Sequence, residues 1–395
     1  MRCPRCGNED PKGFYLGGRG WYCRKCVPFS RILMTDAPKM WEEESTIPDA
    51  EYELGFALTP EQEKAAQEIL EKTREGKNVL VKAVCGAGKT ELVYPVIREG
   101  LSAGKKVGFA ISRRQVVLQI AGRLAKDFPR LKVIPVCEGF TEDTQGDLIV
   151  CTTHQLYRYT GYFDTLILDE PDAFPFKGNP VLQGIAENAS KGTMIYLTAT
   201  PDEWLTEKIQ NHKAEEVPLY KRPSGIPLTV PKVNYLPKEG LALALYGYLR
   251  TETKAGRYAM VFFPTIRETE TFAGIFRRYY RIAVMHSARE DKDAQVRMFQ
   301  RHEARFLFST TVMERGVTFS GIDVLVYKAD HPVFDYASLV QMTGRVGRDP
   351  KNPEGTGIFL CAKKSGEVDK CVSGIMTANR LAFGAENGLT TRKTS

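Results

Sequence analysis

Short apolar runs alternate with longer segments of helical period over most of the chain. In the first half these runs lie at 79–84, 107–111, 148–151, 166–168 and 194–197. A continuous apolar run of this length is typical of a strand buried on both faces, and alternation with helices predicts a parallel sheet with helical crossovers. We therefore predict an α/β lobe over residues 57–220.

A second lobe follows a stretch that is rich in proline and glycine. Regular structure there is interrupted by Pro218, Pro223, Gly225, Pro227 and Pro231. Such a composition is typical of a linker between domains. Beyond it, apolar runs recur at 260–263, 305–308, 324–327 and 357–360. The pattern predicts a second parallel-sheet lobe of similar size over residues 221–395.

The first 35 residues follow neither pattern and contain four of the nine cysteines of the chain. Cys3 and Cys6 form one Cys-x-x-Cys pair, Cys23 and Cys26 form another, and sixteen residues separate the pairs. Two such pairs place four thiolates around one tetrahedral Zn²⁺. A redox dithiol is the main alternative, but this segment lacks the βαβ pattern that usually carries one. We predict a zinc module over residues 1–35.

Charge divides the chain in the same way. The zinc module has seven basic and two acidic residues, whereas residues 36–60 have seven acidic and one basic. We assign residues 36–56 to an acidic linker. The formal net charge of +7 over 395 residues permits a nucleic-acid partner without requiring one. No run of about 18 apolar residues and no apolar signal segment occurs, so neither a membrane span nor secretion is predicted.

Aromatic residues lie among the basic residues of the zinc module. They are Phe14, Tyr15, Trp21 and Tyr22. Rings surrounded by cations suit the stacking of nucleic-acid bases. The same rings equally suit the core that so small a module needs. Both interpretations stay open from the sequence.

A loop with two glycines follows the first strand of the first lobe and precedes a helical segment. It spans Ala83 to Thr90, and Ala83 stands where the usual phosphate-loop pattern has its first glycine. In such a loop the N–H groups and the helix N-terminus bind phosphate, a lysine reaches the β- and γ-phosphates, and a hydroxyl holds Mg²⁺. The predicted ATP-binding residues are Gly86, Ala87, Gly88, Lys89 and Thr90.

Another apolar strand of this lobe ends in two carboxylates, Asp169 and Glu170. We expect Asp169 to hold Mg²⁺ and Glu170 to polarise the attacking water. An acidic strand end is common by itself, and it gains weight because a phosphate loop lies about eighty residues before it. Pro171 restricts the residue before it, so we expect extended backbone at Glu170.

The second lobe contains the sequence Gln-Met-Thr-Gly-Arg-Val-Gly-Arg over residues 341–348. Arginines three positions apart share one face of a helix. Arginines that reach the γ-phosphate neutralise charge during its transfer. A solvated basic helix is the plain alternative. We predict that Gln341, Arg345 and Arg348 contact ATP.

In this order, the motifs resemble the signature of superfamily 2 helicases. From about Phe56 onward the chain contains Asp-Glu-x-Asp, then Thr198-Ala-Thr200, and then Gln-x-x-Gly-Arg-x-Gly-Arg. The resemblance implies two tandem RecA-like lobes and a nucleotide contact at Gly316. It also implies that Gln62 recognises adenine. A capping box with Thr59 as N-cap and Gln62 at its third helical position explains the same residues, and both roles are compatible.

A narrower resemblance is to the late-competence ComFA family. It is carried by Tyr22-Cys-Arg-Lys-Cys26, Asp169-Glu-Pro-Asp-Ala-Phe-Pro-Phe176 and Glu314-Arg-Gly-Val-Thr-Phe319. This resemblance implies a cytoplasmic ATPase, peripheral to the inner face of the membrane, that uses ATP, Mg²⁺ and Zn²⁺ and helps to draw in single-stranded DNA during transformation. It also implies competence proteins as partners, namely the phosphoribosyltransferase-like ComFC, the DNA-processing protein DprA and the uptake channel ComEC.

In such cores the bound strand crosses both lobes and is contacted mainly through its phosphates. Hydroxyls, amides and cations at strand ends suit phosphate binding without sequence readout, although each is equally explained as an N-cap or loop residue. The candidates by motif position are Arg113, Arg114, Thr152, Thr153 and His154 in the first lobe, and Thr265, His286, Thr310 and Thr311 in the second.

The motifs and the resemblance together imply a DNA-stimulated ATPase that advances single-stranded DNA as ATP binds and is hydrolysed. A replication-restart or repair helicase is the first alternative, but the zinc insert of such enzymes interrupts the core, whereas here it precedes the core. A non-catalytic adaptor is the second alternative. The presence of Lys89, Asp169, Glu170, Arg345 and Arg348 argues against it.

Overall fold

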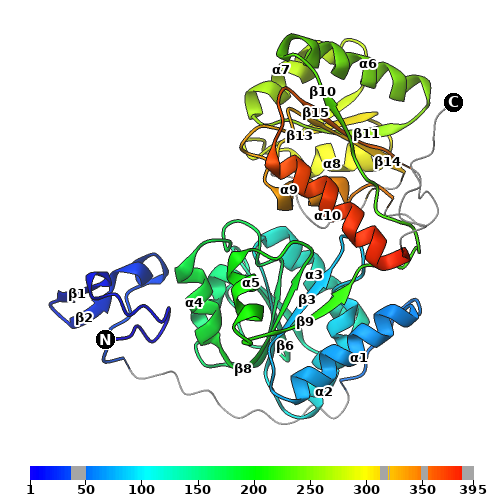
Figure 1. Cartoon of the computed structure of the whole chain (residues 1–395). Coiled ribbons are helices and arrows are strands. Elements are labelled where there is room, and N and C mark those ends of the chain that lie inside the picture. The colour runs from blue at the N-terminus through cyan, green and yellow to red at the C-terminus, as the bar shows by residue number, and fades with distance from the viewer. Residues whose placement is uncertain (37–49, 312–318, 320, 348–354, 385–395) are drawn as a thin grey trace. The chain divides into compact units, whose positions relative to one another are not determined.

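The computed structural model describes residues 1–36, 50–311, 319, 321–347 and 355–384. Contacts divide the chain into two compact units (Figure 1). The first comprises Met1–Ala83 and Gly88–Leu219, and the second comprises Val84–Ala87 and Tyr220–Ser395. The short segment Val84–Ala87 of the phosphate loop therefore belongs by its contacts to the second unit.

The zinc module is built on a two-stranded antiparallel hairpin of β1 (Phe14–Gly17) and β2 (Gly20–Cys23). Gly20 has a φ of +118°, which a residue with a side chain rarely adopts, so the turn of the hairpin requires glycine there. Short 3₁₀ helices η1 (Pro11–Gly13) and η2 (Arg24–Phe29) flank the hairpin. Most of the predicted acidic linker, residues 37–49, lies outside the described residues.

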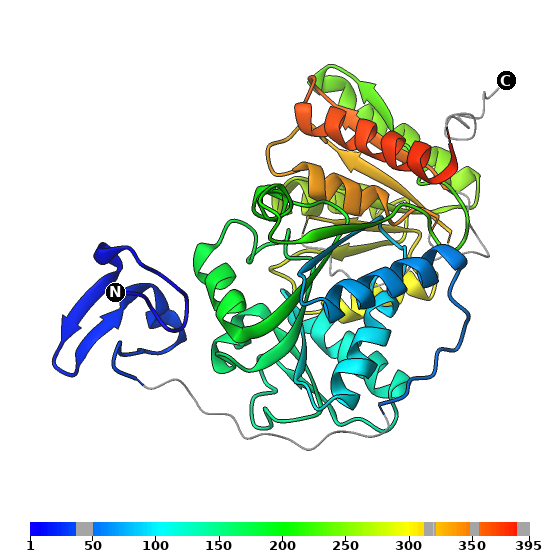
Figure 2. The same cartoon turned by 60° about the horizontal axis from the view of Figure 1, so that its bottom comes forward.

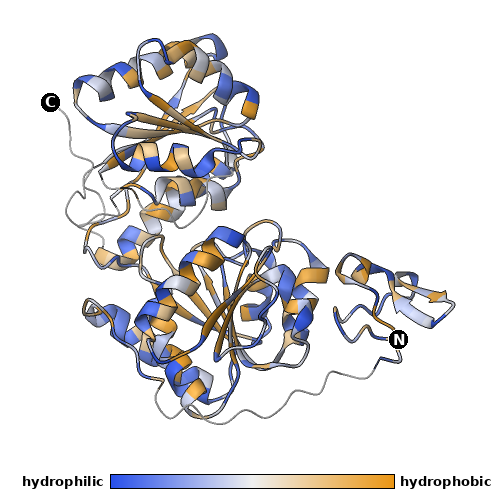
Figure 3. Ribbon diagram, turned by 180° about the vertical axis from the view of Figure 1, so that it is seen from behind, coloured by the Kyte–Doolittle hydropathy of each residue, from blue (hydrophilic) through white to orange (hydrophobic). Residues whose placement is uncertain are grey.

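The first unit contains a seven-stranded parallel sheet in the order β5-β6-β4-β7-β8-β3-β9. The five predicted strands of this lobe all form and lie at its centre. Figure 3 shows hydrophobic residues concentrated on these strands. The strands are β3 (Val79–Ala83), β4 (Val107–Ile111), β5 (Val133–Val136), β6 (Leu148–Thr152), β7 (Phe163–Asp169), β8 (Ser190–Thr198) and β9 (Glu215–Leu219).

Helices cover both faces of this sheet, as a parallel sheet requires (Figures 1 and 2). Helices α4 and α5 and the 3₁₀ helix η4 share one hydrophobic cluster with the strands. The buried cysteines of the zinc module belong to the same cluster. The helices of this unit are α1 (Pro60–Arg74), η3 (Glu91–Val93), α2 (Tyr94–Ser102), α3 (Arg114–Asp127), η4 (Thr153–Arg158), α4 (Pro180–Ala189) and α5 (Glu203–Gln210).

The second unit contains a six-stranded parallel sheet in the order β10-β15-β14-β11-β13-β12. Helices α6 and α7 pack on one face in a single hydrophobic cluster. The elements are β10 (Lys232–Tyr235), η5 (Lys238–Gly240), α6 (Leu241–Lys254), β11 (Tyr258–Phe262), α7 (Ile266–Phe276), β12 (Ile282–Met285), α8 (Lys292–Gln300), β13 (Phe306–Ser309), β14 (Ile322–Tyr327), α9 (Tyr336–Thr343), β15 (Gly357–Cys361) and α10 (Gly366–Phe383). The predicted fold class, two parallel-sheet lobes preceded by a four-cysteine module, is confirmed.

Candidate ATP site and zinc module

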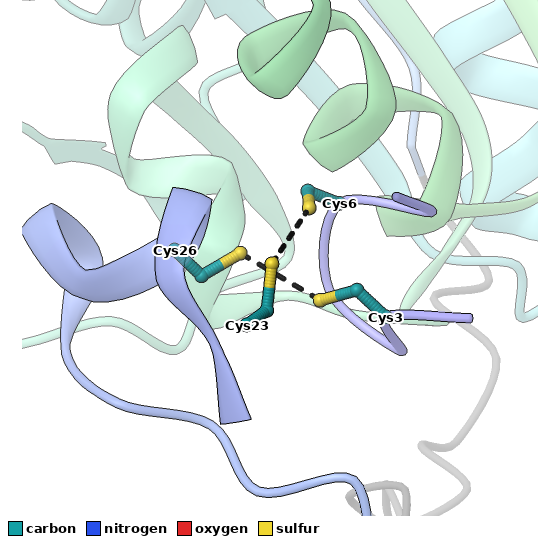
Figure 4. A group of neighbouring side chains, drawn as sticks. All are labelled: Cys3, Cys6, Cys23 and Cys26. Carbon is teal, nitrogen blue, oxygen red and sulfur yellow. Dashed lines mark hydrogen bonds between the residues drawn. The ribbon is translucent and has the colours of Figure 1, made fainter. Parts of the chain in front are cut away.

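The four cysteines of the zinc module converge on one point (Figure 4). All four thiols are buried, and their sulfur atoms lie within 4.8 Å of one another. The Sγ–Sγ distance is 3.7 Å between Cys3 and Cys26 and 3.8 Å between Cys6 and Cys23. Zn–S bonds of about 2.3 Å at tetrahedral angles place two sulfurs about 3.8 Å apart. The cluster therefore fits a structural zinc ion in both number and spacing.

The local backbone and the thiol chemistry of this cluster also suit a metal. Gly7 has a φ of +66° and donates its N–H to the Cys3 carbonyl at 2.9 Å, which closes the first Cys-x-x-Cys knuckle. Hydrogen bonds with the Cys26 and Cys6 thiols lower the pKa of Cys3 below that of a free thiol. The same hydrogen bonds raise the pKa of Cys6 and Cys26, so the cluster favours one thiolate held by neighbouring thiols, and a thiolate is the form that binds a metal.

The zinc module is seated on helix α4 of the same unit. A Cβ atom at Gly184 would lie 2.9 Å from the carbonyl carbon of Cys6 and would collide with its oxygen, so only glycine permits this approach. The Asn188 side-chain amide donates to the Arg5 carbonyl at 3.2 Å. The Arg5 guanidinium lies 5.3 Å from the ring centroid of Tyr157 in η4. The module is therefore an integral part of the first unit.

The phosphate loop follows β3 at the carboxyl edge of the sheet. Gly86 and Gly88 have φ values of +81° and +79°, which explains why both positions are glycine. Thr90 precedes a single 3₁₀ turn, η3, and the α-helix begins only at Tyr94. The helix predicted directly after the loop therefore starts as a tighter turn.

Gln62 packs against this loop from helix α1. The capping box is confirmed, since the Thr59 hydroxyl accepts from the Gln62 N–H at 3.3 Å and Gln62 Oε1 accepts from the Thr59 N–H at 2.9 Å. A Cβ atom at Gly88 would lie 2.5 Å from Gln62 Nε2. Gln62 is thus buried beside the phosphate loop, and adenine recognition by this residue stays a prediction.

The acidic pair ends β7, with β8 between it and the strand of the phosphate loop. The Glu170 carboxylate lies 3.9 Å from Lys89 Nζ. The expectation of extended backbone at Glu170 is wrong, because its φ is +52°. The Glu170 N–H donates to the Leu197 carbonyl at 2.8 Å, and the Glu170 carbonyl accepts a hydrogen bond from the Ala173 N–H, which closes a turn after the strand. A left-handed backbone at a non-glycine residue is a strained conformation, often found at functional sites.

Asp172 links the acidic motif to the end of β8, a role that sequence reasoning did not assign. Its two carboxylate oxygens accept hydrogen bonds of 2.6 Å from the Thr198 and Thr200 hydroxyls. The side chains of all three residues are buried. The role of Asp172 follows from the order of the strands, since β7 and β8 are neighbours in the sheet and these residues lie at their ends. The pairing fixes the loop after Glu170 against the adjoining strand.

In the second unit, Gln341 lies in helix α9, and Arg345 lies just beyond its end. The prediction that Arg345 and Arg348 share a helical face is wrong for Arg345. The helix ends at Thr343 with Gly344 as its C-cap, and residues 344–347 form a turn in which Gly347 has a φ of +66°. Arg348 and Gly316 lie outside the described residues.

The candidate nucleic-acid residues of the first unit follow β4 and β6, on the other side of β7 from the phosphate loop. Arg113 is the N-cap residue of α3, and Arg114 Nε donates to the Glu138 carbonyl at 2.8 Å. Thr152 and Thr153 are buried, and burial lowers the pKa of His154. These residues lie beside one another at one sheet edge.

The candidates of the second unit follow β11, β12 and β13, which are neighbours in the sheet. Thr265 is exposed and caps helix α7 by accepting from the Glu268 N–H at 3.1 Å. His286 Nε2 lies 2.8 Å from Glu270 Oε1, and both His286 and Thr310 are buried. Thr311 is half-buried. Direct contacts of these residues with nucleic acid stay a prediction.

Comparison with known proteins assigns each unit to a helicase-type domain. A family model for the helicase conserved C-terminal domain matches residues 240–350, and one for the res subunit of type III restriction enzymes matches residues 55–203. A solved structure of Dbp5 from S. cerevisiae bound to RNA and ADP BeF3 has a TM-score of 0.58 at 15% identity and covers 83% of this chain and 93% of that one, which shows the shared fold. The fold and motifs define an ATP-hydrolysing, helicase-like enzyme.

Two full-length relatives identify the family. The competence protein ComFA of Streptococcus pneumoniae is 34% identical over 393 residues, which cover 96% of this chain and 90% of the relative. ComFA of Bacillus subtilis is 31% identical over 404 residues, 98% of this chain and 87% of the relative. The chain belongs to the ComFA family and is a helicase-like ATPase of competence. Within the part of the chain that the structure describes, no helix is long and apolar enough to cross a membrane.

Proposed function

We propose that the protein is a single-stranded DNA-stimulated ATPase that moves along the strand and helps to draw transforming DNA into the cell. The observation that carries this proposal is the arrangement of strand ends in the first unit. Lys89 and the acidic pair lie at the ends of β3 and β7, and the nucleic-acid candidates lie at the ends of β4 and β6 on the same edge. One rigid sheet therefore connects the chemistry of ATP to the proposed DNA track.

In the proposed reaction, Lys89 and the N–H groups of the phosphate loop bind the phosphates of ATP. Asp169 and Thr90 hold Mg²⁺, which neutralises phosphate charge. Glu170 accepts a proton from water as the water oxygen bonds to the γ-phosphorus and the bond to the bridging oxygen breaks, which yields ADP and phosphate. Arg345 and Arg348 stabilise the charge on the transferred group.

The left-handed backbone of Glu170 supports its role as the base. The turn after β7 leaves this carboxylate 3.9 Å from Lys89 Nζ, and the loop beyond it is fixed by the bonds of Asp172. Asp172 binds the threonines that end β8, so a shift of that strand end displaces the loop after Glu170. This connection couples ATP hydrolysis to movement of the bound DNA strand.

Family membership supports the biological setting. We place the protein in the cytoplasm at the inner face of the membrane, with ComFC, DprA and the ComEC channel as its partners. The exposed rings Tyr15 and Trp21 and the basic residues of the zinc module are available either to the DNA strand or to such a partner. Crosslinking of the competence proteins in cells, compared between the parent and a module deletion, tests the partner assignment.

The enzymatic test is phosphate release measured with single-stranded DNA, duplex DNA, RNA or no nucleic acid, together with a salt titration of binding. We expect the largest stimulation with single-stranded DNA and weaker binding as salt rises, because phosphate contacts release counterions. Lys89→Ala should abolish stimulated hydrolysis. Stimulation by RNA alone would refute the DNA assignment, and processive separation of duplex DNA would favour the repair-helicase alternative.

A further inference from the structure

A buried arginine in the segment between the two sheets binds the turn that carries Arg345. Arg222 is only 4% exposed. Its Nη1 donates to the carbonyls of Val346 at 2.9 Å and Gly347 at 3.2 Å, and its Nη2 donates to the Gly344 carbonyl at 3.0 Å. The guanidinium therefore binds carbonyls on both sides of Arg345.

The same guanidinium also binds the phosphate-loop segment that belongs to this unit. Arg222 Nε donates to the Cys85 carbonyl at 2.9 Å. A Cβ atom at Gly344 would lie 2.6 Å from the Cys85 Cβ, so the close approach of these two segments requires glycine at 344. Arg222 thus connects main-chain atoms of two loops that both carry nucleotide-binding residues.

The linker holds Arg222 in a defined conformation. Its carbonyl accepts from the Gly225 N–H at 2.9 Å, which closes a β-turn with Pro223 in second place and Gly225 at φ +68°. Farther along, the main chain of Leu228 pairs with both side-chain atoms of the buried Asn379 in α10 at 2.8 Å. The proline-rich stretch is therefore an ordered support.

The energetics favour a specific role for this arginine. A buried charge is strongly unfavourable unless hydrogen bonds replace its water, and a guanidinium has five N–H donors in a rigid plane. Four of its hydrogen bonds end on carbonyls. Three of these carbonyls follow helix α9, whose C-terminal end has negative partial charge. A lysine has the charge but not the planar set of donors.

We propose that Arg222 is a positioning residue for ATP hydrolysis, which sets the backbone on both sides of Arg345 and ties it to the phosphate loop. The proposal rests on the proposed function of Arg345. A misplacement of about 1 Å in a catalytic group lowers rates by up to about 100-fold. The contribution of Arg345 is made in the transition state, so its displacement lowers kcat more than it changes KM for ATP.

The test is the steady-state kinetics of DNA-stimulated ATP hydrolysis by the full chain. We expect Arg222→Ala to lower kcat by about 10- to 100-fold with KM changed by less than about threefold, and Arg222→Lys to recover only part of the loss. Arg305→Ala is the matched control, because Arg305 also donates to a main-chain carbonyl, that of Arg257 at 3.1 Å, but away from the nucleotide motifs. It should keep the parental kcat.

Chemical rescue separates positioning from a merely structural role. Guanidinium chloride at tens of millimolar, far below the molar range that unfolds proteins, should raise kcat of Arg222→Ala by about threefold or more and leave Arg305→Ala unchanged. Folded Arg222→Ala and Arg222→Lys enzymes with parental kcat would overturn the proposal. Unfolding of both variants would also overturn it, since Arg222 would then serve stability alone.

A separate variant distinguishes failure of this inference from failure of the proposed function. Arg345→Ala should abolish most hydrolysis. If Arg345→Ala keeps the parental kcat, the role of Arg345 is wrong. If Arg345→Ala is inactive but Arg222→Ala is fully active, only the positioning role of Arg222 is wrong.

Discussion

Replacing Gly184 by alanine tests whether the zinc module is seated on helix α4. The added Cβ would lie 2.9 Å from the Cys6 carbonyl carbon and would collide with the oxygen, whereas carbon contacts are favourable at about 3.5–4.0 Å. The opposing surface is the main chain of Cys6 in the first Cys-x-x-Cys knuckle, so it adapts poorly. An overpacked contact of this kind costs about 1–3 kcal/mol.

A second glycine in the same unit provides the matched control. Gly122 lies in helix α3, and a Cβ there meets nothing within 4 Å. Both alanines gain about 0.5–1 kcal/mol from the lower entropy of the unfolded chain and the higher helix propensity. The difference between Gly184→Ala and Gly122→Ala therefore isolates the clash, and we expect Gly184→Ala to be less stable by about 1–3 kcal/mol.

The assay is urea unfolding together with hydrogen exchange of peptides that cover residues 3–8 and 180–189. Gly184→Ala should lower the unfolding midpoint relative to Gly122→Ala and should speed exchange in both peptides, because the hydrogen bond from Asn188 to the Arg5 carbonyl is lost with the contact. Equal midpoints and equal exchange in the two variants would refute the seating of the module on α4.

Three further changes have defined outcomes. Asp172→Ala removes the acceptor of two buried hydroxyls and should lower the stability of the first unit by about 2–5 kcal/mol, measured by urea unfolding, and an unchanged midpoint would contradict the assigned bonds. Cys23→Ser should abolish bound zinc in elemental analysis of the purified protein, while Cys137→Ser, a buried cysteine outside the cluster, should retain one equivalent. Burial, together with the hydrogen bond and charge of Asp323, raises the pKa of Glu252 from 4.5 to about 8, so the stability that its neutral carboxyl contributes is full below about pH 4.5 and is lost as the pH rises through about 8. In urea unfolding across that pH range, Glu252→Gln should reduce the dependence of stability on pH, whereas replacement of an exposed residue, Glu303→Gln, should leave it unchanged. An equal pH dependence in the two variants would show that Glu252 is not its source.

Local sequence patterns were sufficient for several features. The capping box at Thr59 and Gln62 forms as predicted, because its partners are three residues apart and the helix itself brings them together. Each Cys-x-x-Cys knuckle is formed by its own four residues, and the β1–β2 hairpin between the two pairs that begin at Cys3 and Cys23 brings them around one point. All nine predicted strands are present, and they include every central strand of the two sheets.

The strands that the pattern missed are the four at the sheet edges, β5, β9, β10 and β12. Three of them contain proline or a charged residue, which an edge tolerates because one side of the strand makes no ladder bonds. Their apolar runs are therefore short or interrupted. Only pairing with a neighbour that is distant in sequence makes them strands.

The conformations around the catalytic motifs also required the tertiary structure. Pro171 indicated an extended Glu170, but Glu170 has a left-handed backbone while its N–H bonds to the Leu197 carbonyl on the next strand. The helical period continued past Thr343, but the helix ends there in the turn that Arg222 binds. Neither partner is close in sequence, so neither signal was available to a local pattern.

The sequence by itself determined the fold class and located the two Cys-x-x-Cys pairs and the predicted ATP motifs, because each is recognised from residues a few positions apart or from the period of a single element. The tertiary structure decided which strand ends adjoin, why Gly184 and Gly344 are glycines, and what the buried Arg222 binds. These features depend on close approaches between segments far apart in the chain. Such approaches are fixed by packing in three dimensions, which no local pattern encodes.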